Sequence, residues 1–159
     1  MPTLDTAIVY PGLVAIEGTN MSEGRGTTRP FELFGAPWVD AHGLTAKLNG
    51  LDLPGVRFRE AWFTPYFSKF AGERCGGCQV HVTDRAAFKP FATVLHIVKT
   101  VRDAYPAEFA FHPDYFDKVM GTASVRTAVE AGTEVAAILD ALTPGLQAFA
   151  ALRQPYLLY

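Results

Sequence analysis

The segment from residue 17 to residue 32 gathers most of the side chains in this chain that could do chemistry. Its charged members alternate with short hydroxyl and amide side chains, and the set comprises Glu17, Thr19, Asn20, Ser22, Glu23, Arg25, Thr27, Thr28, Arg29 and Glu32. Carboxylates serve acid–base chemistry, and arginine binds a ligand carboxylate through paired hydrogen bonds. Glycine at 18, 24 and 26 lets the backbone approach a ligand closely. The segment therefore predicts a loop that presents donors and acceptors to a hydroxyl-rich ligand.

Two interpretations of these charges stay open at the level of sequence. Glycosidases place two carboxylates about 5–10 Å apart across the scissile bond, and Glu17 and Glu23 could supply such a pair. Alternatively, Glu17, Glu23 and Arg25 form an internal ion-pair network that holds the loop in place. A spacing of six residues within a loop does not separate these alternatives.

Other polar and aromatic residues also allow two interpretations, ligand binding or a structural role. His81 lies beside Gln79 and Thr83 on the polar face of a predicted strand, where it serves either a ligand or the structure. Aromatic residues surround a predicted loop at Trp62, Tyr66, Phe67 and Phe70. They suit either the apolar C–H faces of sugar rings or ordinary core packing, and core packing is the expectation for Trp62.

Cys75 and Cys78 give a C-x-x-C spacing that resembles half of a zinc site. There is no second cysteine pair, and a strand rather than a helix follows the spacing, which disfavours a redox motif. We therefore expect no metal and no other cofactor.

Composition and charge narrow the class of protein. The chain has 159 residues, of which 49% are hydrophobic and 19% charged, and its net charge is −2. These values predict one globular domain spanning residues 1–159. Lysine and arginine form no basic run, which argues against a nucleic-acid partner. No unbroken apolar run of 18 residues predicts a membrane span, and the first residues do not resemble a signal peptide.

Periodicity predicts an α+β domain with a small mixed sheet covered by helices. We expect a first helix within residues 1–20 that Pro11-Gly12 kinks or ends, and then a loop with short extended pieces over 17–37. Helices follow at 40–51 and 89–104, and strands at 56–63 and 78–83. Two or three short helices should fill 114–153, interrupted at Gly121, Gly132 and Pro144-Gly145, before an extended tail over 154–159.

Several blocks of the chain resemble the DUF1343 family. The longest runs from Tyr10 to Trp38 and reads YPGLVAIEGTNMSEGRGTTRPFELFGAPW, and the others are LPGVRFRE, CGGCQVHVTD and RQPYLLY. The resemblance implies exo-β-N-acetylmuramidases, glycoside hydrolases that release N-acetylmuramic acid from the non-reducing ends of peptidoglycan fragments. It also implies a Rossmann-like N-terminal domain that carries the main catalytic glutamate, a smaller C-terminal domain and a cleft between them. This chain is similar to the C-terminal domain, so we expect the N-terminal half to be absent from it.

The same resemblance implies roles for individual residues. Arg25 would bind the lactyl carboxylate of N-acetylmuramic acid, and Glu17 and Glu23 would be auxiliary catalytic residues. The remaining substrate contacts would be Thr19, Asn20, Ser22, Gly26, Thr27 and His81, with Tyr66 and Lys69 on the rim. The expected function is one wall of a muramidase cleft, completed by a Rossmann-like N-terminal domain in trans. The alternative is a non-catalytic muropeptide-binding module or a fragment without activity alone. The family implies a periplasmic or secreted location.

Overall fold

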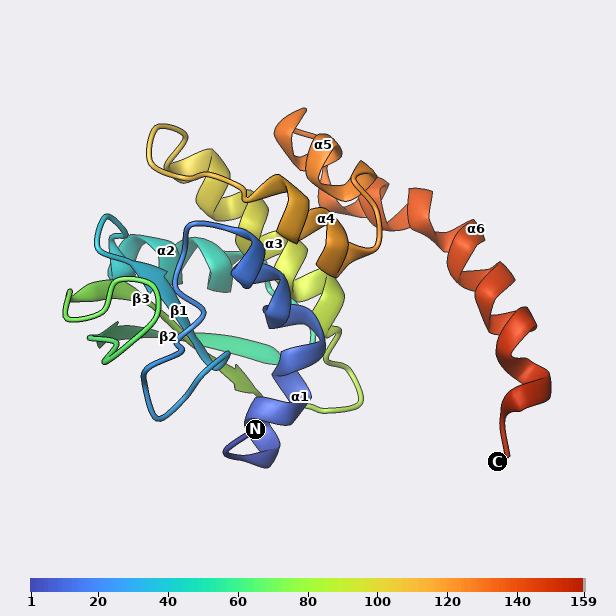
Figure 1. Cartoon of the computed structure of the whole chain (residues 1–159), viewed down its shortest axis with the longest axis horizontal. Coiled ribbons are helices and arrows are strands. Elements are labelled where there is room, and N and C mark those ends of the chain that lie inside the picture. Colours follow the sequence, from blue (N-terminus) through green and yellow to red (C-terminus); the bar gives the residue numbers. More distant parts are fainter. Residues whose placement is uncertain (159) are drawn as a thin grey trace.

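A computed structural model describes residues 1–158 as six α-helices, two 3₁₀ helices and one three-stranded sheet. In chain order these are α1 (Leu4–Leu13), η1 (Val14–Gly18), β1 (Leu33–Ala36), α2 (Ala41–Gly50), β2 (Val56–Phe63), β3 (Cys75–Val82), α3 (Pro90–Ala104), α4 (Pro113–Met120), α5 (Ser124–Glu130), α6 (Val135–Arg153) and η2 (Gln154–Tyr156). The predicted α+β class is confirmed. Figure 1 shows the sheet on one side of α3 and the helices α4 to α6 on the other.

The sheet is antiparallel throughout, which corrects the expectation of a mixed sheet. Its strand order is β1-β3-β2, and β3 runs antiparallel to both neighbours. The chain passes from β1 through α2 to β2, and such a crossover leaves two strands pointing the same way. β3 then inserts between them, so the two parallel strands never pair.

The glycines of the C-x-x-C spacing belong to the central strand and not to a turn. Gly77 faces Gly35 across the ladder, and a Cβ at position 77 would collide with the carbonyl oxygen of Phe34. The strand therefore begins at Cys75, three residues before the predicted start. This close backbone approach accounts for two successive glycines in a strand.

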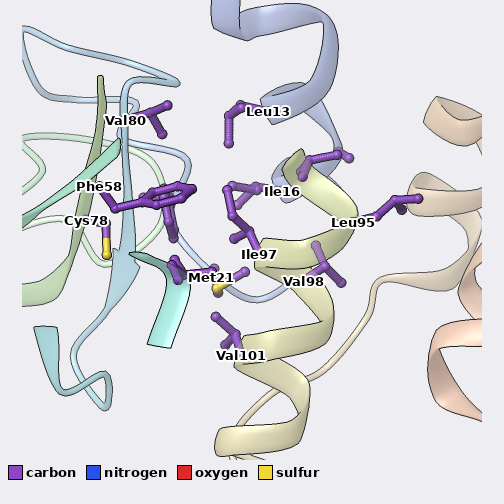
Figure 2. Packing of buried hydrophobic residues seen from close by; sticks show 14 of the residues in the cluster. Leu13, Ile16, Met21, Phe58, Cys78, Val80, Leu95, Ile97, Val98 and Val101 are labelled. Atoms are coloured by element: carbon purple, nitrogen blue, oxygen red, sulfur yellow. The ribbon is translucent and has the colours of Figure 1, made fainter. Parts of the chain in front are cut away.

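The core lies between the sheet and α3. Phe58 and Val80 point from the sheet toward the side of α3 that carries Ile97 and Val101 (Figure 2), and Val98 belongs to the same buried cluster. The helix predicted for residues 89–104 is therefore the central core helix. Leu95 points away from the sheet and is also fully buried.

The C-terminal region departs from the sequence prediction. α6 continues through Pro144 as one helix of 19 residues, and the tail after it forms a 3₁₀ turn at Gln154–Tyr156 and not an extended piece. Proline removes the hydrogen bond to the carbonyl four residues earlier, that of Asp140. Both residues are exposed, so water can solvate that carbonyl. By length and composition alone, the stretch Val135–Tyr156 could cross a membrane. A search for unbroken apolar runs overlooks it because polar residues interrupt it.

A buried carboxylate joins α1 to the sheet. Oε1 of Glu32 accepts hydrogen bonds from the hydroxyls of Thr6 at 2.6 Å and Thr3 at 2.9 Å, and Arg29 contacts Oε2 at 3.1 Å. Thr3 is also the N-cap of α1. Burial disfavours the charged form of Glu32, but the hydrogen bonds from both threonines and the nearby guanidinium outweigh it and lower the pKa.

We predict that Glu32→Gln destabilises the protein in a pH-dependent way. The folded-state pKa lies below the unfolded value, so the carboxylate contributes stability above the unfolded pKa and loses it as pH falls through the folded pKa. At neutral pH the substitution should lower the free energy of unfolding by about 1–3 kcal/mol. The difference from the parent chain should shrink on acidification, as measured by urea unfolding across a pH series.

Glu73→Gln is the matched control, because Glu73 is exposed and its carboxylate makes no ion pair among residues 1–158. A pH-independent effect of Glu32→Gln would contradict the prediction.

Candidate functional site

Residues 17–32, called the signature loop from here on, are held near their start by backbone hydrogen bonds to two different parts of the chain. Ser22 exchanges hydrogen bonds with Gly35 of β1 at 2.8 and 3.0 Å. The backbone N–H of Asn20 donates to the carbonyl of Ala110 at 2.9 Å. The loop thus lies between the sheet edge and the segment before α4, as an ordered structure.

The ammonium group of Lys69 holds the first half of this loop. It donates to the carbonyls of residues 16, 17, 19 and 21 at 3.3, 3.0, 2.7 and 3.0 Å. The carboxylate of Glu23 lies 3.2 Å away and is almost fully buried. Ser68 and Phe70, which flank Lys69, both have positive φ angles of 74° and 58°. Such backbone costs about 1–2 kcal/mol per residue, so the contacts of Lys69 must offset it.

Arg25 stands between the two predicted carboxylates. Its Nε lies 2.6 Å from Oε1 of Glu17 and 3.5 Å from Oε1 of Glu23, and Nη2 also pairs with Glu17. The side chain of Arg25 is 45% exposed, and no hydrogen bond within residues 1–158 uses its Nη1. The hydrogen bond to Glu17 raises the pKa of the guanidinium further. The predicted ion-pair network therefore exists, and one edge of its cation remains open to solvent.

Tyr115 of α4 completes this cluster. Its hydroxyl donates to Oε2 of Glu17 at 3.0 Å, and this bond raises the pKa of the phenol. Glu17 is thereby held by a cation on one oxygen and a phenol on the other. The ring of Tyr115 is about half exposed.

Two further aromatic rings flank the loop next to Arg25. The amide of Tyr66 donates to the carbonyl of Gly26 at 2.8 Å, and the ring of Tyr66 is 90% exposed. Gly26 has a φ of 84°, and a Cβ there would collide with the carbonyl oxygen of Phe67. Only glycine lets the aromatic loop approach this closely. The result is a polar, charged patch bordered by exposed Tyr66, Phe67 and Tyr115.

Comparison with known proteins assigns the family. The family model described as exo-β-N-acetylmuramidase NamZ, C-terminal, matches residues 8–159. This chain belongs to that family. The peptidoglycan β-N-acetylmuramidase NamZ of Bacillus subtilis (strain 168) is 49% identical over 160 residues, which cover all of this chain and 39% of the relative. This chain therefore spans about two fifths of that relative's length.

Solved structures agree with this assignment. A DUF1343 family protein from Bacteroides fragilis superposes with a TM-score of 0.86 at 30% identity, over 96% of this chain and 42% of the other. A second protein of that family and organism gives 0.64 at 22% identity, over 99% and 41%, and supports the fold alone. The predicted resemblance to the DUF1343 family is confirmed.

Several residues that were predicted to contact the substrate use their side chains for hydrogen bonds to the local backbone instead. Thr19 donates to the carbonyl of Ile16 and accepts from Met21, while Thr27 donates to Gly24. Ser22 accepts from the amide of Gly24. In this structure these groups shape the loop, and their contacts with a substrate remain predictions.

Asn20 and Lys69 are engaged in the same way. The side-chain amide of Asn20 donates to the carbonyl of Glu108 at 2.7 Å and accepts from Ala110 at 2.9 Å. Lys69 points toward the four carbonyls and is about three-quarters buried, whereas Tyr66 is exposed, and its contact with a substrate stays a prediction. A rim role for Lys69 stays a prediction that this geometry does not favour.

His81 lies apart from this cluster in its contacts. It is exposed near the end of β3, opposite Arg57, and lines a separate cavity of about 220 Å³ with Arg29, Glu32 and Gln79. No hydrogen bond of the described residues joins it to Glu17, Glu23 or Arg25. Its role in binding therefore stays a prediction.

Sequence reasoning missed two of the residues that border the patch. Tyr115 is 98 positions from Glu17, and its helix gave no local signal of a functional role. Phe67 was noted as aromatic but not assigned to the site. Trp62, expected in the core, is half exposed beneath the guanidinium of Arg74, 4.7 Å from the ring centroid.

We predict that Lys69→Met is among the most destabilising single changes in this domain. It removes the ammonium from four carbonyls and leaves the carboxylate of Glu23 buried without its partner, which typically costs about 3–5 kcal/mol. Chemical denaturation should show this loss, and adding Glu23→Gln to Lys69→Met should recover part of it. Lys47→Met, at an exposed lysine of α2, is the matched control. Equal effects of the two lysine substitutions would refute the role of Lys69.

We predict that both cysteines are inert in the folded protein. Burial raises the pKa of the Cys75 and Cys78 thiols to about 11, and neither side chain is exposed. At pH 8 only about 0.1% of each thiol is thiolate, the reactive form. A disulfide reagent such as DTNB should react at the rate of unfolding, and immediately in denaturant. Rapid reaction of the native protein, resolved with the single Cys→Ser variants, would contradict this.

Within residues 1–158 no three His, Cys, Asp or Glu side chains gather as a metal site requires.

Proposed function

We propose that this domain forms one wall of the substrate cleft of an exo-β-N-acetylmuramidase, which removes terminal N-acetylmuramic acid from peptidoglycan fragments. The observation that carries the proposal is the half-exposed Arg25 between aromatic rims, in a domain that the NamZ C-terminal family model matches. The chemistry of that patch suits N-acetylmuramic acid, which has both an apolar ring face and a carboxylate.

Arg25 supplies a cation for the group that distinguishes this sugar. N-acetylmuramic acid differs from N-acetylglucosamine by a lactyl ether that carries a carboxylate. The Nε and Nη2 atoms of Arg25 face Glu17, and Glu17 fixes the guanidinium in place. The ring of Phe31, 5.0 Å from Arg25 Cζ, supports it from one side. A rigid guanidinium with Nη1 unused can donate to a ligand carboxylate at little entropic cost.

The aromatic rim supplies the apolar part of sugar recognition. Sugar rings present C–H groups on their faces, and these pack against exposed aromatic rings. Tyr66 and Phe67 project from the loop that rests on Gly26, the residue after Arg25. Tyr115 approaches the same guanidinium cluster through Glu17. Ring contact and carboxylate recognition thus fall on neighbouring residues.

The two glutamates are proposed as auxiliary groups and not as the principal proton donor. Both contact the same Nε of Arg25, so their Oε1 atoms lie within about 6 Å of each other, a separation compatible with paired glycosidase carboxylates. Glu23, however, is buried against Lys69, whereas the side chain of Glu17 is 12% exposed. Glu17 is therefore the better placed of the two to touch a sugar hydroxyl.

A non-catalytic muropeptide-binding module is the second candidate function. It uses the same Arg25 and aromatic rim, and it needs no proton donor. The partial match is the reason to consider it: this chain covers 39% of the Bacillus subtilis enzyme, and the rest of that enzyme has no counterpart in the 159 residues. The family resemblance implies that the main catalytic glutamate belongs to a Rossmann-like N-terminal domain, which we propose as the partner, either fused to this domain or in trans.

We predict that this domain binds N-acetylmuramic acid in preference to N-acetylglucosamine, and that Arg25→Ala abolishes the preference. One hydrogen bond between charged groups contributes about 1.5–3 kcal/mol, which corresponds to about tenfold or more in affinity. Titrations of both sugars followed by two-dimensional NMR measure the ratio. Arg59→Ala is the matched control, at an exposed arginine of β2.

An unchanged preference in Arg25→Ala would remove Arg25 from the carboxylate role, and equal affinity for both sugars in the parent chain would contradict the proposed recognition. Release of a chromophore from a β-N-acetylmuramic acid glycoside then separates the two functions. Turnover by this chain that disappears in Glu17→Gln or Glu23→Gln would show a complete acid–base apparatus within these 159 residues. Binding without turnover supports one wall of a cleft or a binding module.

A further inference from the structure

An apolar stripe on α6 continues beyond the part of the helix that this domain covers. Val135 and Ile138 are buried, and Leu142 is half-buried against the core. Leu146, Phe149, Leu152 and Tyr156 follow at three- and four-residue steps along one helix face, extended through η2, and are 64%, 59%, 67% and 80% exposed. The same face therefore packs in its first half and is uncovered in its second.

The remaining surface of the helix is also apolar. Its charged side chains are Asp140 and Arg153, and alanine is the commonest residue in the helix. Figure 1 shows α6 leaving the body of the domain and ending away from it. A helix that is apolar around most of its circumference is normally buried. An exposed apolar surface of this kind marks an interaction site.

A cavity opens where the helix leaves the domain. It measures about 500 Å³ and is lined by Phe91, Met120, Leu142, Gly145 and Leu146. Side chains from α3, α4 and α6 thus form a socket beside the uncovered stripe. A partner that covers the stripe can place an apolar side chain in this socket.

The uncovered part of the helix is too short to span a membrane. The first half of α6 is anchored by Val135 and Ile138, which leaves residues 143–156, about 21 Å of helix at 1.5 Å per residue. A bilayer core is about 30 Å thick. A membrane would therefore require the buried half of α6 to leave the core.

We propose that the distal half of α6, from Leu146 to Tyr156, is the surface on which this domain docks the polypeptide that makes up the rest of its longer relatives. This inference rests on the proposed function, in which such a polypeptide completes the cleft. The Bacillus subtilis relative carries about three fifths of its length outside the matched region. In the relative that polypeptide belongs to the same chain, so docking a single helix loses little translational freedom, and a stripe of four apolar side chains (Leu146, Phe149, Leu152 and Tyr156) suffices. Two separate copies would have to offset about 4–15 kcal/mol of lost freedom with the same stripe.

Hydrogen–deuterium exchange on this chain and on the intact Bacillus subtilis relative tests the proposal. In this chain the amides of residues 146–156 should exchange as a fraying helix does. In the relative the aligned amides should exchange about tenfold or more slowly. Equal exchange would overturn the proposal. So would a protection that follows dimer formation with protein concentration, or binding of this chain to phospholipid vesicles through the helix.

A charged substitution on the stripe gives an independent test. Phe149→Asp should leave the Tm of this chain unchanged, because the ring is exposed. In a hybrid in which this chain replaces the matched region of the relative, the same change should lower the Tm by several degrees. Gln147→Asp, on the opposite face of α6, is the matched control and should have no effect in either protein. Equal small effects of both substitutions in the hybrid would overturn the proposal.

The two proposals can fail separately. Protection of α6 in the relative, together with an absence of any sugar preference at Arg25, would retain the docking surface and reject the proposed recognition. A sugar preference without protection of α6 would do the reverse. If the hybrid does not fold, the exchange comparison on the two unmodified proteins still decides the outcome.

Discussion

The ammonium group of Lys69 is the contact on which the candidate site depends. It gathers four carbonyls from residues 16–21 and the carboxylate of Glu23, and so closes a turn that no regular secondary structure would form. The left-handed backbone at Ser68 and Phe70 is sustained by these bonds. Once Lys69 is in place, Glu23 lies beneath Arg25, and the loop that carries Tyr66 rests on Gly26. A single lysine therefore couples the aromatic rim to the charged patch.

The sheet provides the other constraint on this region. Glu32 fixes the end of the signature loop to the N-terminus of α1 through Thr3 and Thr6. Its neighbour in sequence, Leu33, begins the strand that pairs with β3. The loop is therefore held at one end by a buried carboxylate and along its length by Lys69. This double attachment explains why so many of its polar side chains bond within the loop, since a rigid patch needs its own groups satisfied.

The sequence allowed prediction of the α+β class, the core helix and the chemistry-bearing loop, because each leaves a local pattern. The partners of that loop leave none. Lys69 and Tyr115 reach Glu17 and its neighbours from 52 and 98 positions away, and spacing along the chain carries no information about such contacts. The strand start at Cys75 was missed because glycine disfavours strands locally, whereas close packing against Phe34 requires it. The helix break expected at Pro144 does not occur, because water can solvate the carbonyl of Asp140 that loses its hydrogen bond.

The geometry of the charged patch favours recognition over proton transfer as the contribution of this domain. A general acid in glycoside hydrolysis must face the glycosidic oxygen, and that requires a carboxyl group free of stronger partners. Glu17 is bound by Arg25 and Tyr115, and Glu23 lies buried against Lys69. Freeing either carboxylate would break the contacts that position Arg25. Under the proposed function, the same bonds that hold the guanidinium rigid would leave proton donation to another surface of the cleft, and the proposed docking stripe of α6 would be the place where that surface attaches.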